Sequence, residues 1–303
     1  MNATTGAPEE RARFTGLVIL ATYLGLSAVP AIIATMSGRA SVLVAIAHFA
    51  ALVVVATLIA RRAPGTITEW LPLIAIPLLY SELPHIAAPR LYDPTVQQWE
   101  ATMFGASPAR TAATNWPFPV LSELLHAGYI SYYAIIFGPP LWLYLRGQRD
   151  FFRNTVAGLM TTFALCYAVF ILFPVAGPRY EWPAPAGSFD GPVRRLVLGV
   201  LTAGSAKGTA FPSSHVAVAT VQSLLAFRWS VRAGVGLSVL TTMLAFGAVY
   251  GGFHYAVDVV AGGGVGLALG LALSFTTRDL FAGLVPSLGR SINSVDQSAG
   301  DVR

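Results

Sequence analysis

Two short stretches of the sequence combine residue types that carry out phosphoryl chemistry. The first contains Pro212, Ser213, Ser214 and His215, where a polar stretch meets an apolar one. Proline suits the first position of a helix, because its missing N–H would have no partner there. We therefore expect Ser213, Ser214 and His215 in a first helical turn, where free backbone N–H groups and the helix dipole favour a bound anion.

The second stretch begins another apolar segment and contains His254 and Asp258. These two residues are four apart, so they share one face of a helix. A carboxylate can hold one imidazole nitrogen protonated, which leaves the other nitrogen free to attack phosphorus. We predict that His254 is the nucleophile of a phosphohistidine mechanism and that Asp258 orients it. An imidazolium at His215 would protonate the departing alkoxide.

Negative charge on phosphoryl oxygens requires fixed hydrogen-bond donors. Arg179 offers a forked guanidinium and Lys207 a point charge, and both lie in a polar segment before His215. Together with Ser213 and Ser214, these cations form the predicted phosphate-binding set. The scheme needs no metal and no cofactor. A zinc site on the two histidines and Asp258 is the alternative, but the spacing matches no recognised zinc pattern.

The composition places these residues in a membrane protein. Of the 303 residues, 55% are hydrophobic and 11% are charged, whereas soluble domains carry about 25% charged residues. The charges lie between apolar runs of roughly 20 residues, the length that crosses a bilayer. The net charge is +5, but the sequence has no basic stripe with interleaved aromatic residues. We therefore expect a membrane and a lipid phosphate as partners, and no nucleic acid.

The apolar runs predict an all-α integral membrane protein with about eight transmembrane helices. The predicted spans are Phe14–Met36, Ser41–Ala60, Glu69–Ala88, Val120–Leu145, Asn154–Pro174, Ser213–Trp229, Val231–Gly251 and Tyr255–Phe275. The third span contains Glu82 and His85, and a partly re-entrant segment is its alternative. Three glycines in the last span, Gly262, Gly266 and Gly270, favour close helix packing over a nucleotide-binding loop.

The distribution of positive charge predicts the orientation. An even number of spans places both termini on one side, which carries twelve arginines against seven arginines and lysines on the other. Because positively charged loops are cytoplasmic, we expect both termini in the cytoplasm of a multi-pass cell-membrane protein. His254, His215 and Arg179 then meet at the extracytoplasmic face.

Two long polar segments, residues 89–118 and 175–211, face the same side as the predicted site. Segments of this length without clear periodicity are typically lids, binding loops or disordered. Several basic residues near this face are open candidates for the site lining, namely Lys207, Arg194, Arg195, His85, Arg90 and His126.

The two motif segments resemble the type 2 phosphatidic acid phosphatase superfamily. Its Pro-Ser-Gly-His motif is similar to residues 212–215, with Ser214 in place of glycine. The second half of another family motif, His-x3-Asp, matches His254 and Asp258. The arginine of that motif falls on Ala248, and the lysine of a further motif falls on Leu172. The resemblance implies the same histidine roles as those assigned above.

The resemblance also implies a domain organisation. Residues 66–280 would form a catalytic core of six helices. Two additional N-terminal helices in residues 1–65 would precede this core, and a polar tail, residues 281–303, would follow it.

The leading functional prediction is a lipid phosphatase that hydrolyses a lipid phosphomonoester. A lipid head-group phosphotransferase is the alternative, because residues 174–179 are similar to a proline-rich segment of the inositol phosphorylceramide synthase branch. A non-catalytic lipid-binding or transport protein is a third possibility, because the motif arginine is replaced by Ala248.

Overall fold

The computed structural model of the protein describes residues 6–282, except residue 64 and residues 186–188, and the regular elements of this part of the chain are all helices. The helices are α1 (Gly6–Met36), α2 (Val42–Ala60), α3 (Thr66–Ile86), α4 (Asp93–Phe104), α5 (Pro108–Asn115), α6 (Pro119–Ile130), α7 (Tyr132–Leu145), α8 (Arg149–Leu172), α9 (Pro178–Glu181), α10 (Pro192–Gly204), α11 (Ser214–Ala226), α12 (Val231–Tyr250) and α13 (Ala256–Ala282). This confirms the predicted all-α class. The predicted tail lies outside the described residues, apart from the last two residues of α13.

Five helices in the described part of the chain are long and apolar enough to cross a membrane: α1, α2, α8, α12 and α13. The fourth predicted span is not a single helix. It consists of α6 and α7, which meet at Ser131 with a bend of 42° and together form a sixth candidate span. All eight predicted segments are helical, but the number of complete membrane crossings stays a prediction.

The two remaining segments, α3 and α11, fall outside that set for different reasons. α3 has 21 residues and is long enough, but polar residues such as Glu69, Glu82 and His85 make it less apolar than the five candidate spans. α11 has 13 residues and so extends about 20 Å, less than the roughly 30 Å hydrocarbon core. Most of α11 is buried within the protein, so its length need not match the bilayer.

The two segments expected to be lids, binding loops or disordered contain four short helices instead. α4 and α5 lie in residues 89–118, and α9 and α10 lie in residues 175–211. Each begins with a proline at its first or second position, where the missing N–H costs no hydrogen bond. α5 and α10 are amphipathic, a helical signal that the expectation for these two segments missed.

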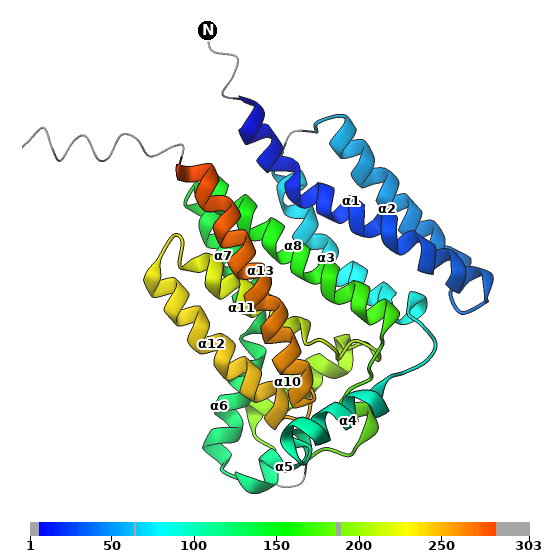
Figure 1. Ribbon diagram of the computed structural model, residues 1–303, viewed down its shortest axis with the longest axis vertical. Coiled ribbons are helices and arrows are strands. Elements are labelled where there is room, and N and C mark those ends of the chain that lie inside the picture. Colours follow the sequence, from blue (N-terminus) through cyan, green and yellow to red (C-terminus); the bar gives the residue numbers. More distant parts are fainter. Residues whose placement is uncertain (1–5, 64, 186–188, 283–303) are drawn as a thin grey trace, which may run out of the picture.

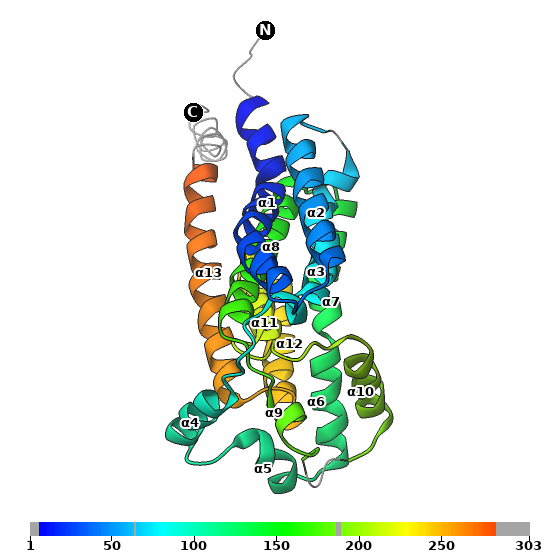
Figure 2. The same ribbon diagram turned by 90° about the vertical axis from the view of Figure 1, so that its right-hand side faces the viewer.

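The long helices form a bundle whose two ends differ. α1, α2, α3 and α8 lie on one side and α11, α12 and α13 on the other (Figure 1). The main hydrophobic core joins α1, α3 and α8 through side chains such as Leu17, Leu73 and Phe163. The start of α1 and the end of α13 lie at the same end of the molecule, whereas α4, α5, α9 and α10 gather at the opposite end (Figure 2).

Three glycines bring α13 close to α11. A Cβ atom on Gly262, Gly266 or Gly270 would collide with Ser213, Ala217 or Leu224 of the facing segment. Only glycine permits this approach, which confirms the packing interpretation of the stripe. α11, which carries His215, and α13, which begins just after His254, are therefore held together along their length.

Candidate active site

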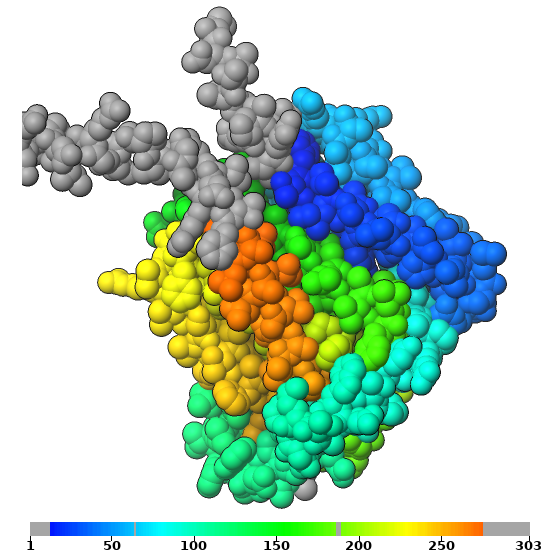
Figure 3. All heavy atoms as spheres, in the orientation of Figure 1, coloured from blue at the N-terminus to red at the C-terminus, as the bar shows by residue number. Residues whose placement is uncertain are grey.

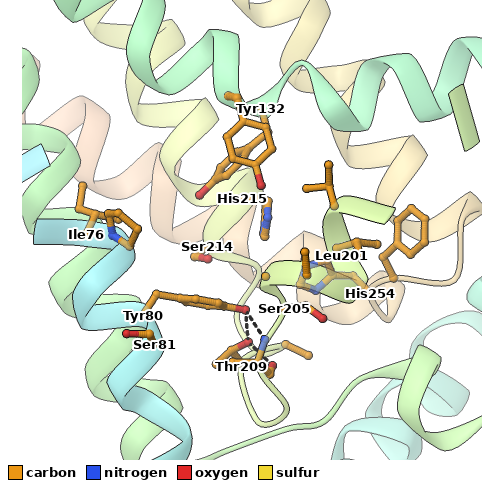
Figure 4. Close-up of a pocket in the computed structure, with 18 of the residues that line it drawn as sticks. Ile76, Tyr80, Ser81, Tyr132, Leu201, Ser205, Thr209, Ser214, His215 and His254 are labelled. Atoms are coloured by element: carbon orange, nitrogen blue, oxygen red, sulfur yellow. Dashed lines mark hydrogen bonds between the residues drawn. The ribbon is translucent and has the colours of Figure 1, made fainter. Parts of the chain in front are cut away.

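A cavity of about 680 Å³ lies between α3, α6, α7, α10 and the first turn of α11. His215 and His254 both line it, and Figure 4 shows the two rings at the same hollow, with Ser214 and Ser205 nearby. Arg179 also belongs to its wall. Residues that are 75 positions apart in the sequence thus face one cavity, as the predicted topology requires.

His254 lies in the turn that joins α12 to α13. Gly252 in this turn has φ of +69°, a backbone conformation that favours glycine. The backbone N–H groups of Phe253 and His254 both donate to the carbonyl oxygen of Ala248, at 2.9 and 3.1 Å. The chain then enters α13, so that Asp258 lies one helical turn beyond His254.

Asp258 holds the ring of His254 from behind. Its Oδ2 atom lies 3.4 Å from Nδ1 of His254 and accepts a hydrogen bond from the backbone N–H of Tyr255 at 2.9 Å. The Asp258 side chain is fully buried, and Oδ1 has no partner among the described residues. With Nδ1 facing the carboxylate, Nε2 is the nitrogen left for chemistry, as a nucleophilic imidazole requires.

His215 lies in the first turn of α11, and its ring centroid is 5.6 Å from that of His254. The rings of Tyr129 and Tyr132 pack against His215 at centroid distances of 5.5 and 4.1 Å. Nδ1 of His215 is buried and has no partner among the described residues. The two imidazoles are close enough for one phosphate group to contact both.

The start of α11 differs from the expectation. The capping residue is Ser213, whose Oγ accepts a hydrogen bond from the N–H of Val216 at 3.4 Å, and the helix begins at Ser214. Pro212 therefore lies before the cap and not inside the first turn, because a serine oxygen caps a helix well. The N–H of Ser213 donates to the carbonyl oxygen of Asp258 at 2.9 Å, so this residue ties α11 to α13. Of the two serines, Ser214 lines the cavity.

Arg179 belongs to α9, which follows Gly177. Gly177 has φ of +95°, and a Cβ there would lie 3.0 Å from Ala210, so glycine lets this segment pass close to the one before α11. The guanidinium of Arg179 donates to Oγ of Ser205 at 2.8 Å. Among the described residues of the cavity wall, Arg179 is the one with a permanent charge.

The other basic candidates are placed elsewhere. Lys207, His85 and Arg90 are exposed and do not belong to the cavity wall. His126 is buried against Tyr250 and Phe253, behind the cavity.

Arg194 lines a neighbouring cavity of about 360 Å³, together with Arg110 and Trp182. This second cavity shares Arg179 and Phe253 with the first. Arg195, the next residue along α10, has a side chain 62% exposed and lines neither cavity.

The two positions where the family motifs have a cation supply none here. Ala248 is fully buried and packs with Tyr129, Val197 and Phe253. Leu172 lies at the end of α8 with 73% of its surface exposed. Within the described residues, no group of three or more histidine, cysteine or acidic side chains is arranged to hold a metal ion.

Tyr80 of α3 is a site residue that the sequence did not reveal. Its hydroxyl lies 2.9 Å from Oγ1 of Thr209 and accepts a hydrogen bond from the N–H of Ala206 at 3.0 Å. Both contacts hold the segment before α11, and Tyr80 itself lines the cavity (Figure 4). A tyrosine in an apolar stretch carries no spacing signal that would single it out.

Two buried carboxylates of α4, Asp93 and Glu100, also lie outside the predicted site set. Their exposed fractions are 2% and 1%, and a separation of seven residues places them on one helix face. That spacing was a readable signal once the segment was recognised as a helix. Burial raises the pKa of Glu100, although hydrogen bonds from Ser107 and from the start of α13 act in the opposite direction.

Comparison with known proteins bears on the whole of this arrangement. Residues 94–273, more than half of the chain, match the family model of the PAP2 superfamily. Neither the curated proteins nor the solved structures contain a match. The matched region runs from α4 to α13 and includes both histidines, Asp258 and Arg179. The chain is therefore a multi-pass membrane protein of the PAP2 superfamily, and this membership supports a phosphatase- or phosphotransferase-type lipid enzyme.

Proposed function

We propose that this protein is a lipid phosphatase of the cell membrane that hydrolyses a lipid phosphomonoester at the extracytoplasmic face. The observation that carries the proposal is the meeting of His215 with the His254–Asp258 pair at one cavity, with 5.6 Å between the two imidazole centroids. This constellation provides a nucleophile, an orienting carboxylate and an acid for the leaving group.

The reaction proceeds in two steps. Nε2 of His254 attacks phosphorus, the bond from phosphorus to the lipid oxygen breaks, and His215 donates a proton to that oxygen. Water then attacks the phosphohistidine, His215 takes up a proton from this water, and the P–N bond breaks to release inorganic phosphate. Arg179 and the first-turn donors at Ser214 stabilise the charge on the phosphoryl oxygens.

The walls of the cavity support a lipid as the substrate. Beyond the histidines the lining is largely apolar, with Ile76, Ile136 and Leu201 among its residues. Two aromatic residues of α7 line the edge of the cavity, Tyr133 with 48% and Phe137 with 41% of its surface exposed. In a membrane, a cavity with such an edge gives an acyl or prenyl chain an apolar path to the histidines.

The test is a panel of lipid phosphates turned over by purified wild type, His254→Ala and the control His85→Ala. His85 is an exposed histidine outside the cavity wall. We expect wild type and the control to release phosphate, and His254→Ala to lose at least about a thousandfold in kcat, because no nucleophile remains. Equal turnover by His254→Ala and wild type would refute the mechanism.

A second function, transfer of a phosphorylated head group, is favoured by the charge of the site. The cavity wall has one permanent cation, Arg179, within the described residues, which matches the single charge of a phosphodiester better than a phosphomonoester dianion. The neighbouring cavity at Arg110 and Arg194 offers space for an acceptor alcohol. Head-group exchange between labelled lipids without free phosphate would support this function over hydrolysis. Lipid binding with neither product would indicate a non-catalytic protein.

A further inference from the structure

We infer that α4 positions the two halves of the site relative to each other, and that Asp93 is the positioning residue that joins them. The inference rests on the proposed function, because it assigns Arg179 to substrate binding and His254 to the chemical step. Neither Asp93 nor any other residue of α4 lines the cavity, so α4 acts on the site through other residues.

Asp93 holds the segment that leads into α9. Its Oδ2 accepts a hydrogen bond from the N–H of Ala176 at 2.8 Å, and its Oδ1 accepts one from the N–H of Gly177 at 2.9 Å. Arg179 follows two residues later. A buried carboxylate that receives two backbone donors is a strong, directional restraint, so Asp93 sets the starting point of the helix that carries the arginine.

The same carboxylate also holds the segment that carries the nucleophile. The hydroxyl of Tyr255 donates to Oδ1 of Asp93 at 3.1 Å and accepts a hydrogen bond from Gln97 at 2.9 Å. Tyr255 directly follows His254, and its own N–H donates to Asp258. Asp93 is therefore bonded to both halves of the site, across a sequence separation of 162 residues to Tyr255.

Glu100 adds a second bond between α4 and α13 on the same helix face. Its Oε2 accepts a hydrogen bond from the N–H of Val257 at 3.3 Å, and its Oε1 accepts one from Oγ of Ser107 at 2.7 Å. The Val257 N–H lies in the first turn of α13, where no intrahelical partner exists. Figure 3 shows the surface of α4 (cyan to green) directly against the lower end of α13 (orange).

Because Asp93 bonds to both halves and Tyr255 to only one, substitutions of these two residues should change kcat and KM differently. Asp93→Asn removes the negative charge that all three donors face and replaces one acceptor oxygen by an NH₂ group, so the restraint on both halves is weakened. Tyr255→Phe removes only the bond to the nucleophile segment and leaves the bonds to Ala176 and Gly177. Glu69→Gln is the matched control, because Glu69 is a carboxylate that ties α3 to Arg149 and Arg153 of α8 away from the site.

The experiment measures kcat and KM of these variants with the best substrate of the lipid panel. We expect Asp93→Asn to raise KM and lower kcat by about tenfold each. Tyr255→Phe should lower kcat by a similar factor with KM unchanged. The double variant should have a kcat no lower than that of Asp93→Asn, because both changes break one connection. Glu69→Gln should leave both constants at wild-type values.

Three results would overturn the inference: Asp93→Asn with wild-type constants, Tyr255→Phe with a raised KM, or additive losses in the double variant. If Asp93→Asn fails to fold, Tyr255→Phe still tests the inference, because it should lower kcat and leave KM unchanged. If the wild-type protein has no turnover, the proposed function fails separately. Binding of a non-hydrolysable lipid phosphonate then provides the test, and it should weaken in Asp93→Asn but not in Tyr255→Phe.

Discussion

In the proposed mechanism, Arg179 provides most of the positive charge that stabilises the phosphoryl oxygens. The family positions that fall on Ala248 and Leu172 supply no charge, and Lys207 is exposed outside the cavity wall. The remaining hydrogen bonds to the phosphoryl oxygens would come from neutral donors such as the hydroxyl of Ser214. Because a single guanidinium must offset the phosphoryl charge, the enzyme should be unusually sensitive to its loss.

We therefore predict that Arg179→Gln lowers kcat/KM for a lipid phosphate by about 10- to 100-fold, since a hydrogen bond to a charged group contributes about 1.5–3 kcal/mol. Arg195→Gln is the control, because it removes the same charge from an exposed position on α10. Steady-state kinetics of both variants at one salt concentration measure the effect. Equal losses in the two variants would show that only the overall positive field matters.

At the scale of elements, the contact between α11 and α13 determines whether the two histidines meet. Gly262, Gly266 and Gly270 remove the side chains that would separate these helices, and Ser213 bonds to the backbone of Asp258 where they begin. Small residues allow such close approach in lipid, where apolar burial contributes little to helix association. The geometry of the site thus depends on residues that make no contact with a substrate.

Gly266→Ala tests this dependence. Its Cβ would overlap Ala217 and Thr220 of α11, so we expect a loss of about 1–3 kcal/mol of stability together with reduced turnover. Gly264→Ala is the matched control, because its Cβ would meet nothing within 4 Å and alanine favours a helix over glycine by about 1 kcal/mol. Thermal unfolding in detergent should shift downward for the first variant and upward or not at all for the second. A shift of the same sign in both would contradict the packing argument.

At the scale of the molecule, α9 and α10, which border the site, lie toward one end, and the two ends of the described chain lie at the other (Figure 2). The arginine distribution predicts that the chain ends lie in the cytoplasm and the proposed site on the far side of the membrane. An enzyme with this orientation would act on lipids of the outer leaflet and release its polar product outside the cytoplasm.

Cysteine labelling can test the orientation. Cys166 is the single cysteine of the chain and is fully buried. Labelling of an introduced cysteine therefore reports the accessibility of its own position, without a contribution from Cys166. Thr111→Cys lies at an exposed position of α5 at the site end, and Gln148→Cys lies in the exposed turn between α7 and α8. In intact cells a membrane-impermeant maleimide should label the first, and it should label the second only after permeabilisation. The reverse pattern would place the site in the cytoplasm.

The sequence alone determined the parts of this protein that depend on local geometry. His254 and Asp258 are one helical turn apart, so their contact follows from the period of 3.6 residues. The apolar runs predicted the helical segments α1 to α3, α6 to α8 and α11 to α13. The glycine spacing of four likewise predicted a packing face.

Only the tertiary structure decided which further residues from distant segments join the two histidines and Arg179 at the site. Tyr80 lies 129 residues from Thr209, and Asp93 lies 83 residues from Ala176. No periodicity records such pairs, because each depends on which faces of separate helices pack together. The short helix α4 was missed for a related reason. Its buried residues Asp93, Val96 and Glu100 are held by contacts with other segments and not by a pattern within its own residues.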